Sequence, residues 1–203
     1  MNDRIIGAVL SGGKSSRMDY VNKSFLKIND KSFIEIIINT LSLRLSTIYI
    51  NTNQDIEKYK KFNRPIISDY IKGFKGPLAG LHSIMKQFEK DKNNLWFALF
   101  PTDAPFIPVK YIDNFINNLP SKKIVMISKI NNKIEPMFSF WSLKALISIE
   151  EELLKSDGVK IMKIAEKLNY EILEFNTSNA KDFMNINTKE DYLKIKELSR
   201  IAN

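Results

Sequence analysis

The sequence predicts an α/β fold in which a mainly parallel sheet lies between two layers of helices. Short apolar runs, the pattern of strands buried on both faces, alternate with longer segments of helical period. Such alternation is typical of parallel sheets covered by helices. The 203 residues contain no internal repeat, low-complexity linker or boundary rich in proline and glycine, so we expect one domain over residues 1–203.

The first half of the chain carries four predicted strands and three predicted helices. Residues 5–10 form an apolar run closed by Gly12 and Gly13, which predicts a buried strand. Similar runs predict strands over 47–51, 65–68 and 96–100. Helical spacing or capping residues predict helices over 32–43, which follows a serine cap, over 55–62, and over 76–88, with Pro77 near its first turn.

The second half is more mixed. Apolar spacing predicts helices over 108–119, 143–154, 160–168 and 188–199. Strands are predicted over 124–128 and 136–141, joined by a turn at Asn131-Asn132, and over 171–175. Ligands of parallel sheets bind beyond the carboxyl ends of the strands. The loops after residues 10, 51, 68 and 100 are therefore the candidate site.

Composition excludes several kinds of chemistry. The chain has no cysteine and one histidine, which rules out disulfide frameworks, zinc-thiolate sites, cysteine nucleophiles and multi-histidine metal sites. No apolar run approaches the roughly 18 residues that a membrane span needs. The apolar run at 5–10 is too short for a secretory signal. We expect a cytoplasmic protein that binds no membrane.

The positive charge is spread along the chain. Lysine and arginine number 31 against 23 acidic residues, a formal net charge of +8. No block of five or six basic residues forms an arm. We interpret the lysines as a solvated basic surface suited to phosphorylated small molecules, and we expect a monomer that binds no nucleic acid.

A glycine-rich loop follows the first predicted strand. Gly12 and Gly13 permit close approach of the backbone, whose N–H groups can cradle phosphate oxygens. Arg17 and Lys23 add the cations that a triphosphate requires. The alternative is a tight strand-to-helix turn with solvated charges. A relaxed P-loop pattern over residues 8–15 is disfavoured, because its variable positions would include the end of the strand.

Asp103 follows the apolar strand over 96–100 and lies between Pro101 and Pro105. A carboxylate at the carboxyl end of a strand is well placed to hold Mg²⁺ against substrate phosphates. The alternative is a capping residue for the helix at Pro108, but the gap between the two weakens that interpretation.

Three further features each have a structural alternative. Gly76 and Gly80 are small residues at a helix start, where a ring or phosphate can lie close, or where the helix simply packs tightly on the sheet. His82 follows on the same helix, and we expect a structural role rather than a catalytic one. Asn185 and Asn187 precede the last helix and could be capping residues.

These segments, in this order, resemble the molybdenum cofactor guanylyltransferase family. The resemblance spans residues 5 to about 195. The matching stretches are Leu10-Ser11-Gly12-Gly13, Ser16-Arg17-Met18, Lys23, Gly76-Pro77-Leu78-Ala79-Gly80, Asp103-Ala104-Pro105-Phe106, Glu135-Pro136-Met137-Phe138 and Asn185-Ile186-Asn187-Thr188.

The resemblance implies a Rossmann-like nucleotidyltransferase that joins GMP from GTP to the phosphate of molybdenum-bearing molybdopterin, with pyrophosphate leaving. It implies a nucleotide-binding set of Leu10, Ser11, Gly12, Gly13, Lys23, Asn51, Asp69 and Asp103, to which we add Gly76 and Gly80. Asp103 would also carry Mg²⁺, and Arg17 would neutralise phosphate charge. The residues expected to be catalytic are Arg17, Lys23 and Asp103. Lys160, Asn185 and Asn187 would face the pterin. Other proteins of cofactor biosynthesis are candidate partners.

Some positions depart from the family pattern. Asp19 stands where the family usually has glycine, Asn22 where it has aspartate, and Lys189 where it has proline.

Other functions remain as alternatives. A cytidylyltransferase for molybdopterin and a sugar-phosphate nucleotidyltransferase are alternatives of the same fold, and a basic nucleic-acid-binding module is an alternative of another class. Gly12, where the cytidylyl relatives typically have alanine, and the two asparagines at 185 and 187 favour GTP.

Overall fold

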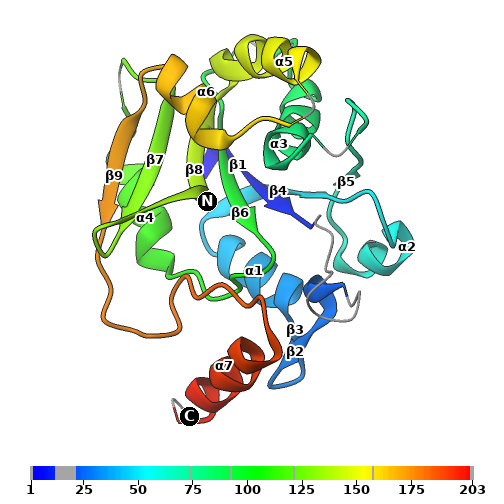
Figure 1. Cartoon of the computed structure of the whole chain (residues 1–203), viewed down its shortest axis with the longest axis vertical. Coiled ribbons are helices and arrows are strands. Elements are labelled where there is room, and N and C mark those ends of the chain that lie inside the picture. Colours follow the sequence, from blue (N-terminus) through cyan, green and yellow to red (C-terminus); the bar gives the residue numbers. More distant parts are fainter. Residues whose placement is uncertain are drawn as a thin grey trace.

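Seven strands form one central sheet in the computed structural model, which describes residues 2–11, 22–73, 75–91, 93–120, 122–156 and 158–201 (Figure 1). Their order is β5-β4-β1-β6-β8-β7-β9. They are β1 (Asn2–Leu10), β4 (Leu45–Asn51), β5 (Ile66–Ile67), β6 (Trp96–Pro101), β7 (Val125–Ile130), β8 (Lys133–Ser142) and β9 (Glu171–Phe175). Only β8 runs against its neighbours in this sheet, so the prediction of a mainly parallel sheet is confirmed.

Helices cover both faces of the sheet, because the strands carry apolar residues on both faces. In β1, Ile5 and Val9 contact one core cluster, while Ile6 and Ala8 contact the other. The first cluster contains residues of α1 (Phe33–Leu41) and α4 (Val109–Asn117). The second contains residues of α3 (Pro77–Lys86), α5 (Leu146–Lys155) and α6 (Ile161–Lys167), which lie together at the top of Figure 1. No helix among the described residues is long and apolar enough to cross a membrane.

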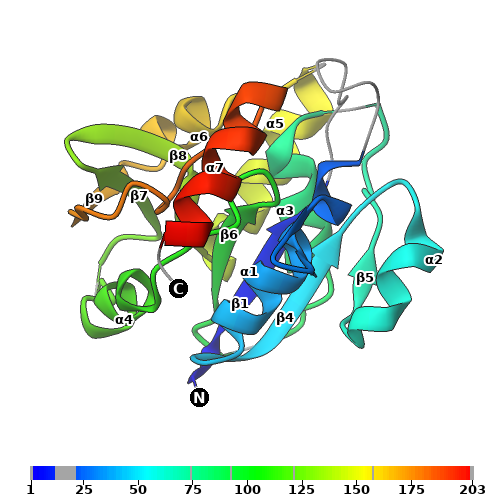
Figure 2. The same ribbon diagram turned by 90° about the horizontal axis from the view of Figure 1, so that it is seen from below.

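The final helix, α7 (Lys189–Ile201), packs on a small hairpin that the sequence did not predict. The hairpin pairs β2 (Lys27–Ile28) with β3 (Lys31–Ser32). Asn29 and Asp30 form its turn with positive φ angles of 47° and 64°, the backbone that a two-residue hairpin requires. A third apolar cluster joins the hairpin, α1 and α7 through Ile28, Phe33, Ile186 and Ile195. Figure 2 shows the ribbons of α7 and α1 from below.

The predicted elements are all present, and several differ from the prediction in extent. The first strand begins at Asn2 rather than Ile5. The segment over 55–62 divides into α2 (Ile56–Tyr59) and a 3₁₀ turn (Lys60–Phe62), and the segment at 143 likewise opens as a 3₁₀ turn before α5. Strand β8 begins at Lys133, before the predicted start at Pro136. The strand can contain this proline because the register of β7 against β8 shifts between Ile127 and Ser128, which leaves Pro136 outside the regular ladder.

Candidate functional site

The strand order places a topological switch point between β1 and β6. From β1 the chain proceeds to β4 and β5 on one side, and it returns to β6 on the other. Such a reversal opens a ligand-binding crevice beyond the carboxyl ends of the two strands. Ser11 and Thr102 directly follow these ends, and Thr102 N–H donates to Leu10 O at 3.2 Å. The loops singled out from the sequence therefore lie where an α/β sheet binds ligands.

Lys23, Asp103 and Asn187 meet at this end of the sheet from three distant parts of the chain. Lys23 Nζ donates to Asn187 Oδ1 at 2.6 Å and lies 4.0 Å from Asp103 Oδ2. The Lys23 side chain is 16% exposed and that of Asp103 is 33% exposed, so both charges are partly withdrawn from water. Burial raises the pKa of the Asp103 carboxyl, and the nearby charge of Lys23 offsets only part of that rise.

Asp103 is not a helix cap. Helix α4 begins at Val109 after an N-cap at Pro108 that makes no side-chain hydrogen bond. The Asp103 carbonyl instead accepts a 2.7 Å hydrogen bond from Ile186 N–H, and Phe106 O accepts one of 2.9 Å from Phe183 N–H. Two backbone bonds thus fasten the segment before α7 to the loop after β6, and the Asp103 carboxylate is left for other partners.

The capping of α7 is done by Thr188 and Asp191 rather than by the asparagines. Asp191 N–H donates to Thr188 Oγ1 at 3.1 Å, and Thr188 N–H donates back to Asp191 Oδ2 at 2.9 Å. This reciprocal pair is a capping box. The side chain of Asn187 therefore serves Lys23, and Asn185 is exposed. The capping interpretation of the two asparagines was wrong.

A second polar group lies at the carboxyl ends of β4 and β5. Asn51 Nδ2 donates to Asp69 Oδ1 at 2.9 Å and to Ile67 O at 3.0 Å. Asn53 Nδ2 donates to the other oxygen of Asp69 at 2.7 Å. Asn53, Asp69 and Gly73 line a shallow hollow of about 290 Å³. The predicted nucleotide-binding residues Asn51 and Asp69 are thus joined by a direct hydrogen bond.

Gly80 faces this group from α3. A Cβ added at Gly80 would collide with the side-chain oxygen of Asn51 and lie 3.0 Å from Leu10 Cδ2. The glycine therefore permits the close packing that places the Asn51 amide. The sequence suggested either tight packing of the helix or a role in ligand binding for Gly80. The structure combines the two, because the tight packing at Gly80 orients Asn51, a predicted nucleotide-binding residue.

Gly80→Ala is expected to weaken binding of GTP, the nucleotide implied by the sequence resemblance, at least fivefold, about 1 kcal/mol, because the new methyl group displaces the Asn51 amide. Calorimetric titration with GTP and Mg²⁺ measures the effect. Gly158→Ala is the matched control, since a Cβ there meets nothing within 4 Å. Equal affinities for both variants would show that the placement of Asn51 does not matter for the nucleotide.

Gly76 and Lys160 lie together, at the start of α3 and of α6. Gly76 is the N-cap of α3 with a φ of 87°, a backbone that disfavours any other residue. Its neighbour Lys75 accepts a 3.3 Å hydrogen bond at its carbonyl from Val159 N–H, and Lys160 follows as the N-cap of α6. Asn187, by contrast, lies beside Lys23. The structure therefore does not bring Lys160 together with Asn187, although both were predicted to face the pterin.

Other predicted residues fall at or beyond the end of β1. Leu10 is the last residue of the strand and is buried. Ser11 N–H donates to Asn51 O at 2.8 Å. Gly12, Gly13 and Arg17, and with them Asp19, lie outside the described residues. Their assignment to phosphate binding stays a prediction.

A buried group of hydroxyls lies beneath the site, and sequence reasoning singled out Ser11 alone among its members. Ser11 Oγ shares hydrogen bonds with Ser24 Oγ and Tyr59 OH, and Ser24 Oγ donates to Thr102 Oγ1 at 3.1 Å. The four residues come from four separate segments, so their spacing gives no signal. Only the position of Ser11 and Thr102 after predicted strands could have drawn attention to them.

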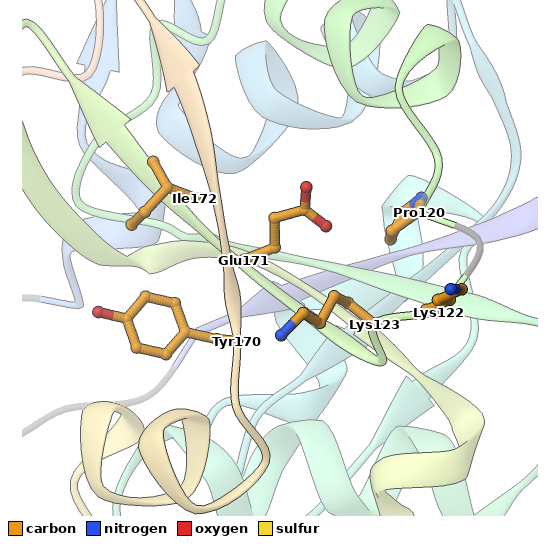
Figure 3. Close-up of a pocket in the computed structure, with 6 residues that line it drawn as sticks. All are labelled: Pro120, Lys122, Lys123, Tyr170, Glu171 and Ile172. Atoms are coloured by element: carbon orange, nitrogen blue, oxygen red, sulfur yellow. The ribbon is translucent and has the colours of Figure 1, made fainter.

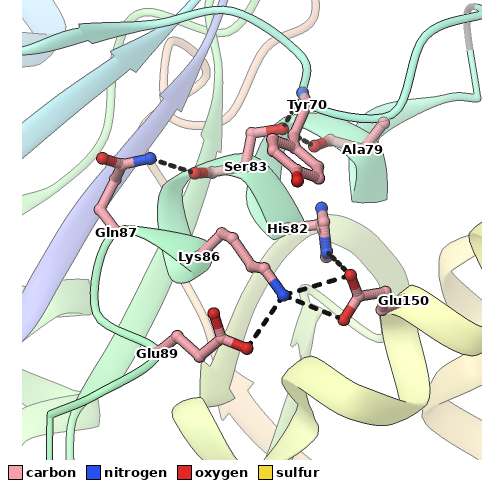
Figure 4. Close-up of polar contacts among 8 residues, drawn as sticks. All are labelled: Tyr70, Ala79, His82, Ser83, Lys86, Gln87, Glu89 and Glu150. Carbon is pink, nitrogen blue, oxygen red and sulfur yellow. Dashed lines mark hydrogen bonds and ion pairs between the residues drawn. The ribbon is translucent and has the colours of Figure 1, made fainter.

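His82 lies between α3 and α5, as Figure 4 shows. Its side chain is fully buried, and its Nε2 is 3.6 Å from Glu150 Oε1. Lys86 Nζ contacts the same carboxylate at 3.2 Å. Burial lowers the pKa of His82 and outweighs the opposing charge of Glu150, which favours the neutral form of the imidazole. This position joins two helices and fits the structural role expected for His82.

A larger hollow lies at the opposite edge of the sheet. Its volume is about 650 Å³, and Pro120, Lys122, Lys123, Tyr170, Glu171 and Ile172 line it (Figure 3). These residues flank the amino ends of β7 and β9. Parallel sheets bind their ligands at the other end, so this hollow is separate from the candidate site.

Comparison with known proteins supports the function class that the sequence predicts. Residues 7–170 match the family described as the MobA-like NTP transferase domain. The chain belongs to the MobA-like NTP transferase family. The enzyme class predicted from the sequence, a nucleotidyltransferase, is confirmed by this match.

Relatives of this MobA-like transferase cover nearly its whole length. A probable molybdenum cofactor guanylyltransferase of Clostridium perfringens is 32% identical over 192 residues, 91% of this chain and 92% of the relative. A molybdenum cofactor guanylyltransferase of Vibrio campbellii is 28% identical over 94% of each chain. The crystal structure of molybdopterin-guanine dinucleotide biosynthesis protein A from Archaeoglobus fulgidus superposes with a TM-score of 0.76 over 97% of this chain and 99% of that one, at 20% identity. The predicted fold class and the family resemblance are confirmed.

Proposed function

We propose that this MobA-like transferase joins GMP from GTP to the phosphate of molybdenum-bearing molybdopterin. A phosphate oxygen of the pterin attacks the α-phosphorus of GTP, and the bond to the departing pyrophosphate breaks. The contact of Lys23 with Asp103 and Asn187 at the β1–β6 crevice carries the proposal. Full-length relatives named guanylyltransferases support the choice of nucleotide and acceptor.

The reaction suits the residues of this chain. The attacking phosphate monoester is anionic at neutral pH, so the transfer needs no general base and no covalent nucleophile. The task of the enzyme is to align two polyanions and to stabilise the charge that develops between them. Lys23, fixed by Asn187 and close to Asp103, is the described cation best placed for that task.

The Asp103 carboxylate suits a divalent cation whose remaining coordination positions are filled by the substrate phosphates and water. The described residues contain no cluster of three or more acidic, histidine or cysteine side chains that could hold a metal by themselves. Mg²⁺ is commonly bound by one or two carboxylates together with substrate phosphates, and a single, partly exposed carboxylate matches that mode. Mg²⁺ bound there would neutralise phosphate charge during the transfer.

The two substrates would occupy different parts of the crevice. Asn51 and Asp69, joined by a hydrogen bond beside Gly80, are assigned to the nucleotide, with Leu10, Ser11, Gly12, Gly13 and Gly76. Asn185 and Asn187 are assigned to the pterin, because they lie beyond Lys23 on the C-terminal segment. Lys160, the N-cap of α6, is assigned to the pterin as well, although it lies near Gly76 rather than near Asn187.

Two alternatives predict other outcomes. A cytidylyl or sugar-phosphate transferase of the same fold would use this crevice with another nucleotide or acceptor, so substrate choice separates it from our proposal. A nucleic-acid-binding module would need clustered free cations. Several lysines instead pair with carboxylates, among them Lys60, Lys86 and Lys163. Salt-sensitive binding of random DNA would favour the module.

GTP is expected to be preferred over CTP at least tenfold in kcat/KM. A missing methyl at Gly12 leaves room for a purine, and discrimination by pocket volume is worth only about 1–3 kcal/mol. Competition kinetics with both nucleotides present measures the ratio. Gly12→Ala should narrow it. Equal use of CTP, or an unchanged ratio in the variant, would contradict this account of base preference.

A further inference from the structure

The hydroxyl of Tyr59 lies at the centre of the buried polar group beneath the site. Tyr59 is the last residue of α2, and its side chain is fully buried. Its ring packs against Phe25, with centroids 4.8 Å apart. Its hydroxyl shares a hydrogen bond with Ser11 Oγ and accepts one from Asn22 Nδ2 at 3.1 Å. Ser11 and Asn22 are the residues that flank positions 12–21.

The same group reaches the backbone neighbours of Lys23 and Asp103, two of the three residues predicted to be catalytic. Ser11 Oγ contacts Ser24 Oγ, and Ser24 follows Lys23 in the sequence. Ser24 Oγ donates to Thr102 Oγ1 at 3.1 Å, and Thr102 precedes Asp103. Ser24 and Thr102 are 1% and 8% exposed. Buried and bonded on several sides, these hydroxyls restrain the backbones from which Lys23 and Asp103 project.

The alternative to a role in catalysis is that Tyr59 serves only the stability of the core. Any buried tyrosine contributes to the core through its ring and needs a partner for its hydroxyl. Tyr111 is such a case: it is fully buried among aromatic rings, and its hydroxyl shares a 2.6 Å hydrogen bond with Ser128 Oγ. Ser128 lies in β7, away from the β1–β6 crevice. The two tyrosines therefore differ in what their hydroxyl groups reach rather than in burial.

We propose that Tyr59 is a positioning residue for the nucleotidyl transfer, which sets the separation of Lys23 and Asp103 through Ser11, Ser24 and Thr102. This inference rests on the proposed function. The hydroxyl touches no substrate. It acts by holding the strand end at Ser11 against the Lys23 segment, so that the cation and the carboxylate are aligned before the substrates bind. Small displacements of such groups reduce rate strongly, because the transition state depends on their placement.

Tyr59→Phe, which keeps the ring and removes the hydroxyl, tests the proposal. We expect kcat for guanylyl transfer to fall at least tenfold, while KM for GTP changes less than threefold. Tyr111→Phe, which removes the hydroxyl of an equally buried tyrosine, should lower the melting temperature to a similar extent and keep kcat within twofold. Equal kcat values for the two variants, with the wild type active, would overturn the positioning role.

A double-mutant cycle adds a measurement that a structural role would not change. If Tyr59 acts through Lys23, Tyr59→Phe should reduce kcat less than twofold in a Lys23→Ala background. A full tenfold loss in that background would also overturn the proposal. Failure of the proposed function is distinct, because the wild-type protein would then form no guanylylated product at all.

Discussion

Lys23→Ala is expected to lower kcat of the guanylyl transfer by roughly 30- to 1,000-fold, a loss of about 2–4 kcal/mol of transition-state stabilisation. Lys23 is mostly buried beside Asp103 and Asn187, where a charge acts more strongly than in water. The fold should persist, since the variant removes a single side-chain hydrogen bond and one weak ion pair. Steady-state kinetics of product formation, with circular dichroism as a check of folding, measures the effect.

Lys27→Ala is the matched control for Lys23. It removes the same charge four residues away, from an exposed position in β2. We expect its kcat to stay within twofold of the wild type. If Lys23→Ala behaves like Lys27→Ala, the cation at the crevice has no part in the chemistry and the role of Lys23 is wrong.

Asp103→Asn is expected to have opposite effects on activity and on stability. Loss of the carboxylate should raise the Mg²⁺ concentration for half-maximal activity at least tenfold, because Asp103 is the proposed protein ligand of the metal. Without metal or nucleotide, the same variant should melt at a higher temperature at pH 7. Burial raises the pKa of Asp103, which means that its ionised form destabilises the folded protein.

The pH dependence of that stability gain has a definite sign. A raised pKa of a carboxyl group in the folded state gives a penalty that is complete above the folded pKa and vanishes below the unfolded value of about 3.9. The melting-temperature difference between Asp103→Asn and the wild type should therefore shrink as pH falls through the folded pKa. Thermal melts from pH 7 to pH 4 measure it, and a difference that grows on acidification would contradict it.

Asp182→Asn separates the metal effect from the charge effect. Burial also raises the pKa of Asp182, whose carboxylate accepts hydrogen bonds from Thr177 and Asn179. This variant removes a similarly disfavoured charge outside the Lys23–Asp103 pair. Its Mg²⁺ requirement should match that of the wild type. An unchanged requirement in Asp103→Asn as well would reduce Asp103 to a turn residue.

The sequence predicted the sheet well because its strands are continuous apolar runs bounded by glycine, proline or polar residues. Asp103 was found for the same reason, since a carboxylate directly after a buried strand stands out. The hairpin of β2 and β3 escaped prediction because each strand has only two residues, too few for a period to show. Tertiary packing against α7, rather than local pattern, stabilises it.

Contacts between distant segments could not be predicted from spacing. Lys23 and Asn187 are separated by 164 positions. The segment that carries Asn187 reaches the site through backbone hydrogen bonds of Ile186 to Asp103 and of Phe183 to Phe106. The alternative interpretation of the asparagines as caps overlooked a signal that was present, because Thr188 and Asp191 have the spacing of a capping box. Tyr59 carried no such signal, since its hydrogen-bond partners Ser11 and Asn22 come from two other segments.

The central claim concerns which part of GTP reaches the pterin, and labelled nucleotide tests it most directly. The protein is incubated with Mg²⁺, molybdenum-bearing molybdopterin and GTP labelled at either the α- or the γ-phosphate. We predict that α-label enters the pterin product while γ-label leaves as pyrophosphate, and that neither happens when the pterin is omitted. Release of γ-label as inorganic phosphate, or a pterin product without α-label, would contradict the account.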